Sequence, residues 1–362
     1  MKPKILVLGA TGVLGLKLLK HLQSLSISTH SAVCYKNTNL LQKYSKKFEI
    51  KNIYSLSYNL DYEALKKILN KVKFDIIYIL DSNLTSFPLV ISSLKFQRKC
   101  IYAIANKDMV IAGGSILVNK IKSTNNIICP LDSEHFSLID LFKYKENKIK
   151  KIYITASGGP FYFKKRNIEN VTKIEVLNHP KWKMGTDINI DSSNFINKVF
   201  EIFELSIIYK LPLNKIDFMI SQDALVHSVI VNNDGRYIFN IFKNNMLIPL
   251  AKPLEYFGYN KTFNSKLNLE DYKSFKLLYR KKDKRFKIFN KINLIKKFNH
   301  CEQINFLILN KRAHYLYLSN KLKYNNIIDY IFKNLKNLNK NYKFRSLNDI
   351  VIYINNVLHK IK

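Results

Sequence analysis

Asp132 and Glu134 stand one residue apart in the segment LDSEH, directly after the apolar run IICPL. This run is typical of the end of a buried strand, and a third acid, Glu201, follows later in the segment DSSNFINKVFE. The apolar spacing of that segment predicts a helix that begins with Asp191 or Ser192 as its cap. Three carboxylates without a cysteine are the ligand set expected for Mg²⁺ or Mn²⁺, with positions left open for substrate and water. The sequence therefore predicts a divalent-metal site.

Asn197 and Lys198 precede Glu201 by four and three residues, separations that place side chains on one face of a helix. A surface ion pair between Lys198 and Glu201 is the alternative interpretation, and such pairs contribute little to stability. Ser157 lies in TASGGPF, where a strand leads into a loop whose small residues leave backbone amides free to face an anion. Together with Ser192 at the expected helix start, these polar residues predict a phosphate site.

The N-terminal segment ILVLGATGVLGLKLLKHL reads as a strand, a glycine turn and an amphipathic helix. Gly9, Gly12 and Gly15 would let the backbone approach a pyrophosphate, and the amides at the helix start would face its charge. This order is the beginning of a dinucleotide-binding βαβ unit. A tight strand-to-helix turn without a ligand is the alternative.

The second expected strand, in HSAVCYKN, ends at Lys36 and Asn37. NAD-binding proteins usually place an acid at this position to accept hydrogen bonds from the ribose hydroxyls. An ammonium and an amide suit a ribose 2′-phosphate better, so the sequence favours NADPH over NADH. An exposed loop lysine in a lysine-rich chain is the alternative interpretation.

Helices and strands alternate further along the chain, which predicts a mostly parallel sheet. Helices are expected at 61–73 and 87–96, and strands at 74–80 and 99–106. Asn106 and Lys107 close the last of these strands, at the edge where α/β sheets bind ligands. Later, ALVHSVIVNNDGRYIFNIF predicts a hairpin with an Asp-Gly turn. His227 in this hairpin is as readily a buried histidine of the core as a residue of a site.

These patterns predict an α/β protein of three parts. The first is an N-terminal Rossmann-like parallel sheet, the second a central α+β catalytic and dimerisation domain, and the third a small C-terminal helical domain. The expected ranges are 1–131, 132–253 and 281–362, with a linker over 254–280.

The composition limits the kinds of binding partner and the cellular compartment that we expect for this protein. The chain has 60 Lys+Arg against 26 Asp+Glu, a formal net charge of +34. The lysines occur in every segment, so we interpret them as solvated side chains and expect no nucleic-acid partner. The four cysteines are too widely spaced for a metal knuckle and are expected to be reduced core thiols. No secretory signal and no run of ~18 apolar residues is present, so a cytoplasmic protein without a membrane partner is expected.

Eight segments together resemble the 1-deoxy-D-xylulose 5-phosphate reductoisomerase family: GATGVLG, YKN, ANKD, LDSEH, ASGGPF, HPKWKMG, DSSNFINKVFE and HSVIVNNDG. They occur in that family's order and spacing, over most of residues 5 to 255. The part from DSEH to INKVFE is the most specific. The resemblance implies a homodimeric enzyme that needs NADPH and a divalent cation, Mn²⁺ or Mg²⁺ with Co²⁺ as a further option. It would rearrange the phosphosugar 1-deoxy-D-xylulose 5-phosphate and reduce the product to 2-C-methyl-D-erythritol 4-phosphate.

The resemblance also implies a role for each candidate residue. Asp132, Glu134 and Glu201 would be metal ligands, Ser133 and Lys107 would touch the oxygenated end of the substrate, and Ser157, His179, Ser192, Asn197 and Lys198 would hold its phosphate. Trp182 and Met184 would form a mobile flap over the substrate, with Gly185 as its hinge beside the cofactor. The NADPH site would be lined by Gly9, Thr11, Gly12, Val13, Leu14, Lys36, Asn37, Asn106 and Asp108.

The chain departs from the family pattern at several positions. Asp108 replaces a glutamate, Ser221 stands where a histidine is usual, and DSNLTSF replaces a glycine-rich stretch. Lys311 stands where an acid is expected. Two other functions remain as alternatives. A semialdehyde dehydrogenase would need a catalytic cysteine, and none lies between residues 130 and 300. A basic RNA-binding protein with a vestigial nucleotide unit would lose affinity steeply with salt.

Overall fold

The computed structural model describes residues 2–141, 148–164, 167–181, 184–259, 275–279 and 283–361. Within them, backbone contacts divide the chain into two compact units. The first unit comprises Met1–Val110, Ser115–Ile139 and Lys243–Leu267, and the second comprises Ile111–Gly114, Asp140–Phe242 and Asn268–Lys362. The three-part division expected from the sequence stays a prediction.

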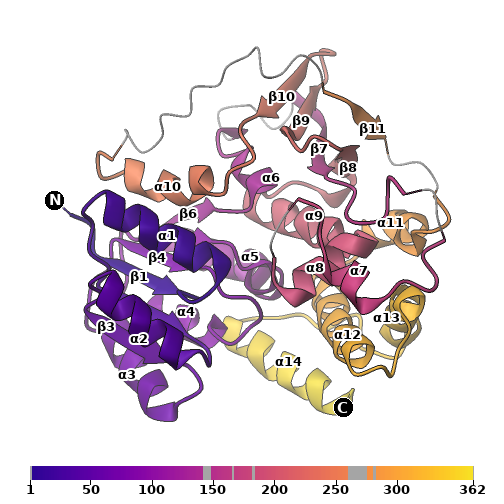
Figure 1. Ribbon diagram of the computed structural model, residues 1–362. Coiled ribbons are helices and arrows are strands. Elements are labelled where there is room, and N and C mark those ends of the chain that lie inside the picture. The colour runs from indigo at the N-terminus through magenta and orange to yellow at the C-terminus, as the bar shows by residue number, and fades with distance from the viewer. Residues whose placement is uncertain are drawn as a thin grey trace. The chain divides into compact units, whose positions relative to one another are not determined.

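The first unit contains a parallel six-stranded sheet in the order β3-β2-β1-β4-β5-β6, as the alternation predicts (Figure 1). Its strands are β1 (Ile5–Leu8), β2 (Ser31–Cys34), β3 (Asn52–Ser55), β4 (Ile76–Ile79), β5 (Ile101–Ile104) and β6 (Ile127–Pro130). The helices between them are α1 (Val13–Ser24), α2 (Thr38–Lys47), α3 (Asn59–Leu69), α4 (Phe87–Ser93) and α5 (Lys107–Ser123), and α6 (Ser133–Phe136) follows β6. All residues of β1, β2, β4 and β5 are buried, which explains their near-continuous apolar sequences.

A helix from much later in the chain completes the first unit. This is α10 (Leu247–Glu255), whose Leu250 and Leu254 belong to the same hydrophobic core as residues of β1 and α1. The buried hydroxyl of Tyr78 on β4 donates a hydrogen bond of 2.9 Å to the carbonyl of Leu250. The chain therefore returns to its N-terminal sheet after building most of the second unit.

The second unit contains a mixed five-stranded sheet in the order β10-β9-β7-β8-β11. Its strands are β7 (Ile149–Ala156), β8 (Ile216–Ser221), β9 (Val226–Asn232), β10 (Tyr237–Ile241) and β11 (Leu277–Tyr279). β7 and β8 are parallel, and the other pairs are antiparallel. The expected hairpin is confirmed: Gly235 takes a positive φ of 85° in the turn between β9 and β10.

Helices α7 (Lys173–Leu177), α8 (Thr186–Asn194) and α9 (Ile196–Tyr209) and the 3₁₀ turn η3 (Leu213–Lys215) belong to the second unit. The C-terminal segments are η5 (Lys287–Lys291), α11 (Ile292–Ile295), α12 (His300–Leu318), η6 (Tyr324–Asn326), α13 (Ile327–Leu335) and α14 (Leu347–Lys360). Figure 1 shows α12 beside α13, and α8 and α14 also contact α12. The expected helical C-terminal region is therefore confirmed.

The prediction that one helix begins at Asp191 or Ser192 is wrong. Both residues lie within α8, and the chain breaks at Phe195, whose φ of 67° is left-handed, before α9 begins. This conformation is unfavourable for a bulky residue. Burial of the Phe195 ring offsets the cost, because it packs against Phe286 and Phe289 with ring centroids 4.9 Å away in each case.

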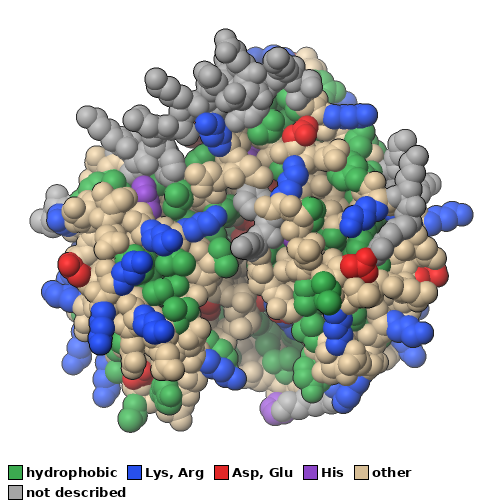
Figure 2. Space-filling view, in the orientation of Figure 1, with side chains coloured by type: hydrophobic (Ala, Val, Ile, Leu, Met, Phe, Trp, Pro, Cys, Tyr) green, Lys and Arg blue, Asp and Glu red, His purple; other side chains and the backbone are tan. Residues whose placement is uncertain are grey.

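Charged side chains are spread over the surface, and in Figure 2 lysine and arginine are scattered over the visible face rather than gathered into one patch. This distribution agrees with the interpretation of the basic composition as solvated lysines. All four cysteines are buried free thiols, as expected. In the described ranges, no helix has both the length and the apolar character that a membrane crossing requires.

Candidate active site

Asp132 and Lys107 form an ion pair at the carboxyl edge of the parallel sheet in the first unit. Asp132 follows β6 and caps α6, where its carboxylate accepts a 3.3 Å hydrogen bond from the Glu134 amide. Burial acts to raise the pKa of Asp132, but the Lys107 ammonium and the His135 ring outweigh it and hold this pKa well below its usual value. The hydroxyl of Ser133 donates to the carboxylate of Glu134. Asp132 and Glu134, two of the expected metal ligands, therefore lie next to each other, and Lys107 is paired with Asp132.

Glu201 is the third expected ligand and lies on α9 in the second unit, where only 1% of its surface is exposed. Asn197 donates to one of its carboxylate oxygens and the Lys198 ammonium contacts the other, each at 2.5 Å. The three residues therefore share one helix face, as their spacing predicts. The Lys198 side chain is also only 9% exposed, so the pair is not a surface ion pair. Each oxygen of this buried acid therefore has a hydrogen-bonding partner, as a buried carboxylate requires.

His179 and Ser157 form the centre of the expected phosphate site, also in the second unit. The His179 Nε2 and Ser157 Oγ atoms are 3.1 Å apart, and the Lys181 amide donates to His179 Nδ1 at 3.2 Å. Nδ1 is an acceptor, so the proton of the neutral ring lies on Nε2, which donates toward Ser157. Burial, with the charges of Lys198 and Lys181, lowers the pKa of His179 to about 4. The ring is therefore neutral at physiological pH.

The glycine loop after β7 packs directly on α8. Gly158 and Gly159 take positive φ values of 89° and 59°, and a Cβ on Gly159 would lie 2.7 Å from the carbonyl oxygen of Ser192. Only glycine permits this approach. The structure therefore brings the loop that carries Ser157 against Ser192, although Ser192 lies near the end of α8 instead of capping a helix.

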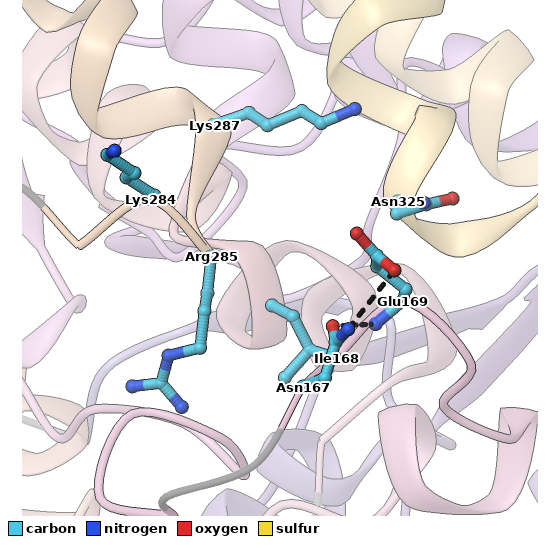
Figure 3. Close-up of a pocket in the computed structure, with 7 residues that line it drawn as sticks. All are labelled: Asn167, Ile168, Glu169, Lys284, Arg285, Lys287 and Asn325. Atoms are coloured by element: carbon cyan, nitrogen blue, oxygen red, sulfur yellow. Dashed lines mark hydrogen bonds between the residues drawn. The ribbon is translucent and has the colours of Figure 1, made fainter.

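Arg285 holds the same loop from its other side and was not identified from the sequence. Its guanidinium donates to the carbonyls of Phe161, Tyr162 and Lys164, and it is paired with Asp283 at 2.7 Å. Arg285 also lines an open pocket of about 560 Å³, and in Figure 3 its guanidinium extends away from Glu169 and Asn325 on the other wall. A single side chain thus binds three backbone carbonyls of the segment 161–164, directly after the glycines. No sequence spacing signals this role, because the contacts span more than 120 residues.

The expected cofactor loop has the close backbone approaches that a dinucleotide turn requires. Gly9 takes a φ of 84°, and a Cβ there would lie 2.5 Å from the Asp81 amide nitrogen. A Cβ on Gly15 would lie 2.4 Å from the Ala10 carbonyl oxygen. Gly12 is the N-cap residue of α1, preceded by Thr11 and followed by Val13 and Leu14 at the helix start. The amides of Gly9 and Ala10 donate to the carbonyl of Val33 on β2, which holds the turn at the end of β1.

The other expected cofactor residues mostly make local contacts. Asn37 caps α2, Asn106 caps α5, and the carboxylate of Asp108 accepts from the Asn83 amide at 3.0 Å. Lys36 is exposed at the end of β2. Asn106 also donates to Asp81, a residue that the sequence pattern did not mark, whose pKa is raised to about 6 chiefly by burial. The only signal for Asp81 was its position in DSNLTSF, which departs from the family pattern.

The expected flap is described in part. Met184 and Gly185 precede α8, and the carbonyl of Met184 accepts a 3.3 Å hydrogen bond from Asn189. Trp182 lies outside the described residues. His227, which the sequence left open, is buried on β9 and stacks on Phe242 with ring centroids 3.7 Å apart. This environment favours a core role for His227.

A family profile and curated relatives of this chain carry the same family name. A family profile described as the 1-deoxy-D-xylulose 5-phosphate reductoisomerase C-terminal domain matches residues 128–209. The 1-deoxy-D-xylulose 5-phosphate reductoisomerase of Pelagibacter ubique is 30% identical over 95% of this chain and 93% of its own length. The protein of the same name from a Wolbachia pipientis strain is 29% identical over 96% and 94%.

Solved structures show the same fold. A DOX-P reductoisomerase crystal structure with NADPH, fosmidomycin and magnesium has a TM-score of 0.86 at 21% identity, covering 99% of this chain and 97% of that chain. The Zymomonas mobilis 1-deoxy-D-xylulose 5-phosphate reductoisomerase with NADPH has a TM-score of 0.81 at 21% identity, covering 100% and 98%. The similarity therefore includes the C-terminal helices as well as the two sheets.

Replacing Arg285 with lysine tests its hold on the glycine loop. Lysine keeps the charge beside Asp283 but cannot donate to all three carbonyls, so we expect the free energy of unfolding to fall by about 1–3 kcal/mol. Arg236→Lys is the matched control, since Arg236 pairs with Asp234 two residues earlier in the same way but is 72% exposed. Chemical denaturation of both variants measures the difference, and equal stabilities would contradict the role given to Arg285.

Proposed function

The chain belongs to the 1-deoxy-D-xylulose 5-phosphate reductoisomerase family, and from this membership we propose how its own residues perform the family's reaction. That reaction is the NADPH- and divalent-metal-dependent rearrangement and reduction of 1-deoxy-D-xylulose 5-phosphate to 2-C-methyl-D-erythritol 4-phosphate, a step of isoprenoid precursor biosynthesis by the methylerythritol phosphate pathway. The observation that carries the site is the buried Glu201 carboxylate, whose two oxygens are held by Asn197 and Lys198.

We propose Asp132, Glu134 and Glu201 as the ligands of one divalent cation, Mg²⁺ or Mn²⁺, with Co²⁺ as a further option. The donor set fits, because hard cations prefer carboxylate oxygens and do not require sulfur. The ammonium groups of Lys107 and Lys198 limit the repulsion among the acids. When bound, the cation polarises the substrate carbonyl and stabilises the negative charge that develops on oxygen.

The two ends of the substrate meet different side chains in this proposal. Lys107 and Ser133 contact its oxygenated end, where the ammonium can donate to a substrate oxygen. The phosphate is held by Ser157, His179, Ser192, Asn197 and Lys198. A neutral His179 suits this task, since its Nε2–H can donate to a phosphate oxygen. Anchoring the phosphate fixes the reacting carbons in position before chemistry begins.

The flap is the remaining substrate element. We propose that Trp182 and Met184 close over the bound phosphosugar, with Gly185 as the hinge, and that closure excludes water before hydride transfer. The hydrogen bond from Asn189 to the Met184 carbonyl supports an anchored end at the start of α8. A Cβ on Gly185 would meet no atom within 4 Å, which leaves room for the backbone to turn there.

NADPH occupies the carboxyl edge of the first unit in this proposal. The pyrophosphate lies on the start of α1, and the 2′-phosphate lies at Lys36. Asn106 and Asp108 act through the loop after β4, which both of them bind through Asn83. The residues assigned to the cofactor are Gly9, Thr11, Gly12, Val13, Leu14, Lys36, Asn37, Asn106, Asp108 and the hinge residue Gly185.

We propose a homodimer formed through the exposed face of the second sheet. Tyr237 and Tyr279 are 62% and 54% exposed on this face, and Phe239 is 41% exposed. These side chains line an open groove of about 650 Å³ with Val229 and Met219. An apolar sheet face of this kind is stabilised when a second sheet covers it, and a second copy of the chain offers the same surface.

We propose a cytoplasmic location for the enzyme. Four cysteines that all remain free thiols are typical of a reducing compartment.

Glu201→Gln tests the metal site and the activity together. Loss of one ligand charge should lower kcat at least about 1000-fold, the factor that corresponds to several kcal/mol of lost charge stabilisation, while the fold remains. NADPH oxidation is measured with 1-deoxy-D-xylulose 5-phosphate and Mn²⁺, with and without chelator, and the chelator should stop the wild-type enzyme. Glu255→Gln, at an exposed pair with Lys252, serves as the control and should keep full activity. Unchanged activity of Glu201→Gln would remove this residue from the site.

Lys36→Ala tests cofactor selection. Losing one ammonium contact to the 2′-phosphate should raise the KM for NADPH about 10- to 100-fold, whereas the KM for NADH should change less than about twofold. Steady-state kinetics with the two cofactors measure the ratio. Lys47→Ala, also on the first unit but in the last turn of α2, should affect neither. Equal effects of Lys36→Ala on both cofactors would reject the 2′-phosphate role.

Phe239→Glu tests the dimer. Glutamate at this position places a charge in the apolar part of the contact, where it must be desolvated, so the variant should sediment as a monomer at concentrations where the wild type is a dimer. Analytical ultracentrifugation measures the masses. Tyr58→Glu, at a 58% exposed position of the first unit, should leave the dimer intact. A wild-type chain that sediments as a monomer would contradict the proposal.

A further inference from the structure

Two acids on α8 face α12 and meet cationic partners there. Lys311 Nζ lies 3.0 Å from Asp187 Oδ2, and His314 Nδ1 lies 3.2 Å from Asp187 Oδ1. His314 Nε2 lies 2.9 Å from Asp191 Oδ1, which also accepts a 2.8 Å hydrogen bond from Asn310. Asp187 and Asp191 are four residues apart on α8, and Lys311 and His314 are three apart on α12. The contacts therefore join one face of each helix.

His314 is the centre of this arrangement. Its side chain is 2% exposed, and each ring nitrogen faces a carboxylate, so both nitrogens act as donors only when the ring is protonated. Burial alone would lower the pKa of His314, but Asp191 and Asp187 outweigh it and raise this pKa to about 9. Burial likewise acts to raise the pKa of Asp187, but His314 and Lys311 lower it. At neutral pH two cations therefore face two anions.

Two other helices that pack against α12, α13 and α14, direct their charged groups elsewhere. On α13, Asp329 is bound by Lys287, and Lys333 is exposed. On α14, Asp349 caps its own helix, and its basic residues His359 and Lys360 are exposed. The acids that set the charge of His314 are thus those of α8.

α8 lies between two parts of the proposed substrate site. At its first turn, Asn189 holds the carbonyl of Met184 in the flap. Near its other end, the carbonyl of Ser192 packs against Gly159, whose loop carries Ser157. A shift of α8 along α12 would therefore move the flap anchor and one wall of the phosphate site together.

We propose that Asp187, Asp191, Lys311 and His314 form an ionic clamp that positions α8, and through it Ser192 and the flap anchor, for the phosphate end of the substrate. Lys311 and His314 are positioning residues in this scheme, since neither touches the substrate. The inference rests on the proposed function. The clamp also explains why Lys311 is tolerated at a position where the family resemblance predicts an acid. The charge of Lys311 is balanced by that of Asp187. The His314–Asp191 pair is buried, whereas Lys311 and Asp187 are partly exposed. The buried pair specifies one register of the two helices, because a shift leaves a buried charge without its partner.

His314→Gln removes the charge and one of the two contacts. We expect the KM for 1-deoxy-D-xylulose 5-phosphate and the Kd for inorganic phosphate, measured by calorimetry, to rise about tenfold, while the KM for NADPH and kcat change less than about twofold. In the wild type the clamp is intact below pH 9 and weakens as His314 loses its proton above it. The substrate KM should therefore rise above pH 9 in the wild type, with a smaller rise in the variant. His300→Gln is the control, since His300 is also on α12 but contacts the carbonyls of Ile111 and Ala112 on α5.

Charge reversal provides a second test that does not depend on His314 variants folding well. Asp187→Lys and Lys311→Glu alone should each weaken phosphate binding, and the double variant should bind phosphate more tightly than Asp187→Lys alone, because the contact between residues 187 and 311 is restored with opposite polarity while the contact of residue 187 with His314 is not. Normal phosphate affinity in His314→Gln and in both single reversals would overturn the clamp. Phosphate binding is measured without turnover, so an inactive wild-type enzyme would reject the proposed function while still testing the clamp.

Discussion

A buried carboxylate that needs a partner for each oxygen is the constraint on which the second unit depends. Glu201 is almost fully enclosed, and an enclosed charge is costly unless it is paired and hydrogen-bonded. Asn197 and Lys198 can satisfy it only if all three residues lie in the first turns of one helix. These residues lie in the first turns of α9, which begins at Ile196 directly after the left-handed Phe195. Because the chain breaks at Phe195, α8 is a separate helix with its own direction. The positions of Ser192 and of the flap residues before α8 depend on that direction.

A lysine partner recurs at several other acids of the described chain. Asp132 is held by Lys107, Asp187 by Lys311, and in the sheet Asp217 is held by Lys296 at 2.6 Å. Acids are scarce in a chain with 26 Asp+Glu and 60 Lys+Arg. A buried acid therefore finds a cationic partner readily, whereas the surplus bases remain in solvent. The unusual composition thus leaves the electrostatics of the interior close to neutral.

Local patterns predicted the elements whose stability is local. Five of the six parallel strands, the hairpin with its Asp-Gly turn and the shared face of Asn197, Lys198 and Glu201 all follow from short-range periodicity or spacing. Strand β3 (Asn52–Ser55) was not predicted. The break at Phe195 did not, because its cost is offset by Phe286 and Phe289 from some 90 residues later in the sequence. The role of Arg285 was not predicted for the same reason, because its partners are backbone carbonyls of a loop that is distant in the sequence. The metal-ligand set came from family resemblance more than from spacing, and its convergence stays a prediction.

The return of α10 to the first sheet has a consequence for synthesis on the ribosome. Leu250 and Leu254 fill part of the core between β1 and α1, and the Tyr78 hydroxyl has its partner on α10. The nascent nucleotide-binding half therefore leaves the exit tunnel with an apolar surface still open, and it is sealed only after some 250 residues have been translated. The catalytic half emerges in the meantime, so the two halves mature together and not in sequence. Until α10 has been translated, the apolar surface that it later covers is available for chaperones to bind.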